Sequence, residues 1–195
     1  MNLLRYLRNV ATGRYRHWNT EHVPLVQTLH QRVRELPSFE RAVLLSVVVA
    51  SVLVVDQLLG PDAGKGKIMR ADARQLTRRE FFHIYFLLAA GFLAIFLSKA
   101  DLSEHRAVLE GSFAHLFHHD PARDESYCKF SEKLKNSDHP SAAFLYLYSE
   151  LSCLAGEPGP SEAKDLARPG LFVVAMGSGS KTMFELVQRE LGGAS

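Results

Sequence analysis

Two histidines come closest to the spacing of a chemical site. His115 and His119 lie four residues apart in an expected helix, so both imidazoles could face one metal ion. A metal ion needs three or four converging ligands, and the chain spacing supplies only these two. We therefore predict no metal site and interpret His118 and His119 as a solvated helix end, where the helix dipole favours a cationic ring. Metal binding by the His115/His119 pair remains the alternative.

Another candidate is the glycine-rich segment 177–182, GSGSKT, near the C-terminus. It follows an apolar run at 171–176 that predicts a short strand, and backbone N–H groups before a helix can bind phosphate. However, a serine separates Gly179 from Lys181, so the spacing of a nucleotide-binding P-loop is absent. We therefore expect a strand, a glycine-rich turn and a last helix at 182–191, without a bound nucleotide.

The remaining polar candidates are isolated residues. Glu80 and His83 form one Glu-x-x-His pair, whereas di-iron bundles use two such pairs and two further glutamates. No second histidine lies within the apolar stretches to join His83 as a haem ligand, and Asp56 is near enough to a helix end to reach water. Cys128 and Cys153 have no metal or redox spacing and are expected to be free, with a single disulfide between them as the alternative. We predict a non-enzymatic protein with no catalytic residue, metal or cofactor.

The elements that would position such residues are dominated by two stretches, 42–59 and 81–98, that are apolar on every side of a helix. Eighteen helical residues span about 27 Å, close to the thickness of a hydrocarbon core. The eleven Phe, Leu and Ile residues of the second stretch favour membrane insertion by roughly 3–7 kcal/mol. The predicted fold is all-α, a two-helix transmembrane hairpin with amphipathic N-terminal helices and a small helical C-terminal region. The alternative is a soluble domain with two core helices.

Caps, breaks and apolar stripes set the other elements. Thr77 and Glu80 have the spacing of a capping box, which would start the second apolar helix. Further helices are predicted at 20–36, 101–119, 125–136 and 140–155. The chain then divides into a basic amphipathic N-terminal arm at 1–38, a transmembrane helical hairpin at 39–99 and a polar helical C-terminal region at 100–195.

Positive charge is unevenly distributed. The net charge of +2 argues against a nucleic-acid binder. Basic residues instead flank the apolar stretches, where anionic lipid headgroups would lie. The residues predicted to contact headgroups are Arg5, Arg8, Arg41, Lys65, Lys67, Arg78 and Arg79.

These features predict a non-catalytic accessory subunit of a large membrane protein complex, with the other subunits and anionic membrane lipids as partners. Residues 1–18 are rich in arginine and contain no acid, a pattern of mitochondrial targeting segments and of interfacial helices. The expected location is therefore the mitochondrial inner membrane, in a respiratory-chain or ATP synthase complex. The alternatives are a soluble all-helical protein-interaction module and a small membrane haem- or metal-binding protein.

Overall fold

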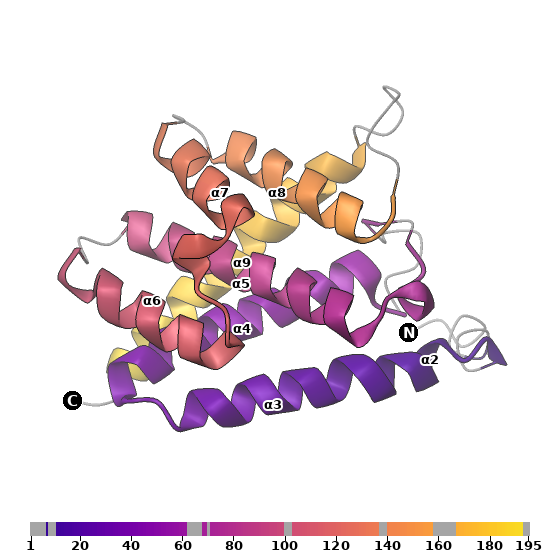
Figure 1. The fold of residues 1–195 in the computed structure, drawn as a ribbon, viewed down its shortest axis with the longest axis horizontal. Coiled ribbons are helices and arrows are strands. Elements are labelled where there is room, and N and C mark those ends of the chain that lie inside the picture. The colour runs from indigo at the N-terminus through magenta and orange to yellow at the C-terminus, as the bar shows by residue number, and fades with distance from the viewer. Residues whose placement is uncertain are drawn as a thin grey trace.

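The protein is a bundle of helices around one shared hydrophobic core (Figure 1). A computed structural model provides the structure, and every regular element in the part of the chain that it describes is a helix, as predicted. The described residues are 7, 11–61, 68–69, 71–99, 103–136, 140–157 and 167–192. Each of the three predicted regions falls partly outside these residues.

The N-terminal segment forms one edge of the bundle. It comprises α2 (Arg14–His17), a π-helix η1 (Trp18–His22) and α3 (Val23–Arg34), which runs along the lower side in Figure 1. Leu25, Leu29 and Val33 are buried because their spacing places them on one face of α3. The predicted helix at 20–36 is therefore found, but its first residues belong to the π-helix, where Trp18 and His22 turn inward.

The two apolar stretches form the long helices α4 (Ser38–Leu59) and α5 (Arg78–Lys99). α4 follows directly after Pro37, and the predicted capping box starts α5. Thr77 N donates to Glu80 Oε2 at 2.6 Å, and Glu80 N donates to Thr77 Oγ1 at 3.3 Å. Both helices are long and apolar enough to cross a membrane, which is weak support for membrane association because the core helices of soluble proteins meet the same criterion.

α5 lies at the centre of the bundle, and every residue from Ile84 to Leu97 is buried. The helices that follow pack around it: α6 (Ser103–Phe117), α7 (Glu125–Asn136) and α8 (Ser141–Leu154) (Figure 1). Gly91, near the middle of α5, allows close approach, because a Cβ atom there would lie 3.1 Å from Leu147 Cδ2 of α8.

The last helix, α9 (Ala167–Gly192), packs mainly along α4. The predicted strand at 171–176 and the glycine-rich turn at 177–182 are wrong, because both segments lie inside this one helix. Phe172, Met176 and Met183 are fully buried on one side of α9. Leu171 and Val174 of the apolar run are exposed on the other side of the helix, so the run spans both faces and its composition did not reveal the helical period.

Candidate functional site

The most distinctive polar site lies between η1 and the start of α5, and we term it the His22 cluster: the buried Trp18, His22, Phe81 and Tyr85 and, at its exposed edge, Asp56 of α4. The Tyr85 hydroxyl and His22 Nδ1 are 3.0 Å apart. The Trp18 ring stacks on the imidazole with 3.8 Å between ring centroids, and it meets Phe81 edge-on at 5.9 Å. The cluster thus joins the N-terminal segment to the hairpin through ring contacts and one buried hydrogen bond.

Burial sets the charge state of His22. His22 is only 5% exposed, and this burial lowers the pKa of its imidazole from 6.5 to about 4. A neutral imidazole that accepts from Tyr85 carries its proton on Nε2, which lies 3.9 Å from Asp56 Oδ1. This arrangement suits the attachment of η1 to α5 rather than catalysis, because Tyr85 is completely buried and no substrate can reach its hydroxyl.

This cluster could not be predicted from the sequence, because the hydrogen-bonded His22 and Tyr85 are 63 positions apart. The π-helix that turns His22 inward also has no marked sequence signature. The only usable signal was His22 itself, placed one turn before the apolar stripe of α3.

The predicted headgroup-contact residues are divided by the structure. Arg41 is exposed in the first turn of α4, whereas Arg78 and Arg79 are exposed at the start of α5, which lies beside the end of α4. The hairpin therefore holds these charges at opposite ends. Arg5, Arg8, Lys65 and Lys67 lie outside the described residues. Lipid contact by all seven residues stays a prediction.

The structure separates the two histidines of the candidate metal pair. α6 ends at Phe117, and His118 takes a positive φ of 50°, which redirects the chain. The His119 ring then lies edge-on to Phe86 at 4.6 Å, with Nε2 3.3 Å from Asp124 Oδ2, whereas His115 faces His118. Within the described residues, no group of three His, Cys, Asp or Glu side chains is arranged to hold a metal ion.

Glu80 and His83 also do not act as a pair. The Glu80 carboxylate turns back to the Thr77 N–H, and this hydrogen bond lowers the pKa of Glu80. His83 is half-buried and stacks against Phe86 with 5.9 Å between ring centroids. Cys128 and Cys153 are free, as expected, and both are exposed.

The glycine-rich segment cannot bind phosphate through its backbone, because it lies in the interior of α9, where backbone N–H groups are used within the helix. Its role is packing. A Cβ atom on Gly179 would lie 2.6 Å from Phe92 Cζ and 3.3 Å from Val54 Cγ2. Gly179 therefore lets the backbone of α9 approach both helices of the hairpin.

Comparisons of the chain with protein-family models, curated proteins and solved structures find no match. The function is therefore argued from the geometry of this chain.

Proposed function

We propose that this chain is a non-catalytic helical protein-interaction module whose apolar hairpin forms the core of its own bundle. The observation that carries the proposal is the enclosure of α5. Every residue from Ile84 to Leu97 is buried, as is 83% of the most apolar stretch of the helix. A spanning helix gains its insertion energy from side chains that face lipid, and this one faces its own chain.

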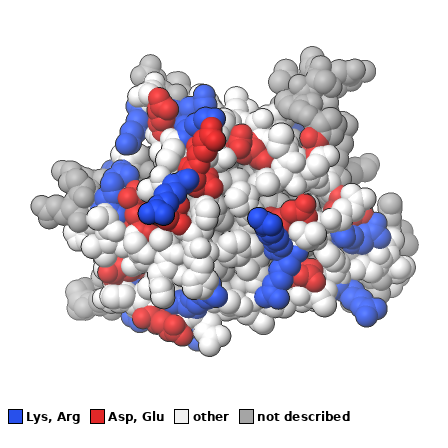
Figure 2. Space-filling model, in the orientation of Figure 1, with Lys and Arg blue, Asp and Glu red and all other residues white. Residues whose placement is uncertain are grey.

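The charges around α5 lead to the same conclusion. Phe130 of α7 packs near Gly91, at the middle of α5, and Lys129 and Lys133 are exposed within one turn of Phe130. At the centre of a membrane each lysine would cost about 2.5–3.5 kcal/mol. The two together offset the roughly 3–7 kcal/mol that the apolar stretch of α5 gains by insertion. Figure 2 shows that positive and negative side chains are interspersed on this face, which favours contact with water.

α9 offers the surface for a protein partner. Its outer face exposes Val174 (65%) and Leu171 (46%), two of the largest apolar exposures among the described residues. Gly170 and Gly177 lie on the same helix, and a Cβ atom at either position would meet nothing within 4 Å. A helix of another protein can therefore approach the backbone of α9 closely and cover the two apolar side chains.

The first experiment separates the two environments of the hairpin. The full chain is produced in its host without detergent, and the membranes are extracted with alkaline carbonate. We expect the chain in the aqueous fraction as a folded helical species by circular dichroism. Retention in the carbonate-washed membranes would overturn the proposal.

A second experiment tests the interaction surface. A photo-reactive amino acid replaces Val174 in the full chain, and the control places it at Glu132, which is exposed on α7. We expect a discrete crosslinked partner, identified by mass spectrometry, only from position 174. Equal labelling from both positions, or none from 174, contradicts a partner surface on α9.

A second candidate function is the accessory subunit of a membrane complex. It is favoured by the length of the hairpin, since α4 and α5 have 22 residues each and contain stretches that pass for membrane spans. Placement in the mitochondrial inner membrane, in a respiratory-chain or ATP synthase complex, rests on the basic N-terminal arm alone. The carbonate extraction above decides between this candidate and the water-exposed module.

A further inference from the structure

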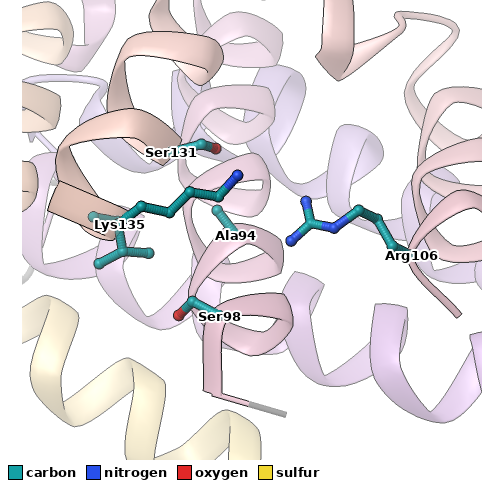
Figure 3. A pocket seen from close by; sticks show the side chains of 6 residues that line it. Ala94, Ser98, Arg106, Ser131 and Lys135 are labelled. Atoms are coloured by element: carbon teal, nitrogen blue, oxygen red, sulfur yellow. The ribbon is translucent and has the colours of Figure 1, made fainter. Parts of the chain in front are cut away.

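A small notch lies where the end of α5, the start of α6 and the end of α7 meet. Ala94 and Ser98 of α5 form its floor, Arg106 of α6 lies on one side, and Ser131 and Lys135 of α7 lie on the other. Figure 3 shows that the guanidinium of Arg106 and the ammonium of Lys135 point toward each other across this floor. Two cationic groups thus converge on a site that is separate from the His22 cluster.

The Ser131 hydroxyl supplies a second, independent observation. Its oxygen is buried beside the Tyr127 hydroxyl, and within the described residues it makes no hydrogen bond of ordinary distance and angle. The neighbouring Tyr127 hydroxyl donates to Glu110 Oε1 at 3.2 Å. Burial raises the pKa of Tyr127 to about 12, although the Ser131 hydroxyl beside it lowers that pKa in part. A buried hydroxyl without a partner is costly, and a ligand oxygen in the notch would accept its hydrogen bond.

The size of the notch limits what enters it. The cavity volume is about 10 Å³, which holds about one water-sized atom. One oxygen of a tetrahedral oxyanion has this size, and the rest of the anion would remain at the mouth between the two cationic groups. The closed part is therefore too small for a ring or an alkyl chain.

The local charge favours an anion. Arg106 Nη1 is paired with Glu110 Oε1 at 3.1 Å, so this pair is neutral as a whole, and Lys135 leaves a charge of +1 beside it. The remaining guanidinium N–H groups, the ammonium and the Ser131 hydroxyl are all donors. The Ser98 hydroxyl donates to Ile95 O at 2.8 Å, so its oxygen can only accept. Three donor groups around one oxygen-sized space match the acceptor oxygens of a phosphate group.

We infer that the notch between Arg106, Ser131 and Lys135 binds the phosphate group of an anionic ligand, either a soluble phosphate compound or a lipid headgroup. One phosphate oxygen occupies the closed space and accepts from Ser131. The other oxygens accept from Arg106 and Lys135 at the mouth. None of these three residues is among those predicted from the sequence to contact headgroups.

The test is a titration of the ¹⁵N-labelled full chain with inorganic phosphate at constant ionic strength, followed by amide shifts of α7. We expect saturation with a dissociation constant on the order of 1 mM. Lys135→Gln and Arg106→Gln each weaken binding about tenfold, since each removes a charge-assisted donor. The matched control is Lys133→Gln, which removes the same charge from the same helix. The Lys133 ammonium lies over the Tyr146 ring and does not line the notch.

Vesicle flotation distinguishes a lipid headgroup from a soluble phosphate compound. Vesicles that contain phosphatidic acid are compared with vesicles of phosphatidylcholine only, with the same variants. Flotation that Lys135→Gln abolishes and Lys133→Gln retains identifies a lipid headgroup. Saturation by inorganic phosphate without flotation identifies a soluble compound. The inference is overturned if neither probe binds, or if Lys133→Gln weakens binding as much as Lys135→Gln does, because the charge would then act without the notch.

Discussion

Helices α5 and α9 both help to build the core, yet their sequences achieve this in opposite ways. α5 fills space with large side chains, including the fully buried Phe81, Phe86 and Phe92. α9 instead removes a side chain at Gly179, so that the Phe92 ring occupies the place of its Cβ atom. The comparison shows that a core helix can be defined by what it places in the interior or by what it leaves out.

The two helices also differ in what they leave exposed. α5 has no outer face along its central turns, whereas α9 buries one stripe and exposes Leu171 and Val174 on the other side. A helix that is covered on every side can only support the fold. A helix with one free face can also bind a partner, so the interaction proposed above is assigned to α9.

The largest expected effect comes from emptying the space that α5 fills. Phe92→Ala removes a fully buried ring and leaves a cavity against α9, so we expect a loss of about 3–5 kcal/mol in the free energy of unfolding. The control is Val174→Ala on the exposed face of α9, which should change stability by less than about 0.5 kcal/mol. Urea unfolding followed by circular dichroism measures both values. A loss below about 1 kcal/mol for Phe92→Ala would mean that α5 is not the core in solution.

The next largest effect is a pH dependence of stability, which comes from His22 where the N-terminal segment packs against α5. The pKa of His22 falls from 6.5 in the unfolded chain to about 4 in the fold. Between these values the unfolded chain binds a proton that the folded chain does not. The free energy of unfolding should therefore decrease as pH falls from 6.5 to 4, by ~3 kcal/mol in total, and this term vanishes above pH 6.5.

The matched variant for this pH dependence is His22→Gln, which keeps a polar side chain beside Tyr85 but cannot titrate. Thermal unfolding at several pH values compares the two proteins. The difference between them should be confined to the window from pH 6.5 to 4, because the other histidines contribute equally to both. Parallel pH profiles would show that Trp18 and Tyr85 do not keep water from the imidazole.

A smaller effect separates the two kinds of glycine in α9. Gly179→Ala places a Cβ atom 2.6 Å from Phe92 Cζ, and the strain should cost about 1–3 kcal/mol. Gly177→Ala, two residues away, meets nothing within 4 Å and should stabilise the helix by about 0.5–1 kcal/mol. The same substitution in one helix thus has opposite signs, which chemical unfolding resolves. Equal effects would contradict the close approach of α9 to α5.

The contrast between these helices also explains which parts of the fold the sequence could predict. α4 and α5 were predictable because their long central stretches are apolar on every side of the helix, and the start of α5 was predictable because its cap is local. α7 was predicted with its observed bounds at 125–136. In each case the decisive interactions lie within a few residues along the chain.

The parts that failed depend on contacts between distant segments. Glycine favours a turn in isolation, and only the neighbouring Phe92 and Val54 explain why Gly179 belongs in a helix. The four-residue spacing of His115 and His119 did not bring their rings to one side, because the positive φ of His118 turns His119 toward Asp124. The notch at Arg106 and Lys135 joins three helices, so no spacing along the chain indicates it.

The smallest effect tests the local signal that made the start of α5 predictable. Thr77→Ala removes the oxygen that accepts from Glu80 N, and an N-cap of this kind is worth about 1 kcal/mol. Thr28→Ala is the control, because Thr28 lies inside α3 and its hydroxyl donates to Pro24 O. The loss of this hydrogen bond is offset by the higher helix propensity of alanine. We expect a lower melting temperature only for Thr77→Ala. An unchanged melting temperature would mean that packing of the buried α5 side chains fixes the start of the helix without its cap. Burial would then outweigh the local hydrogen bonds of Thr77 and Glu80.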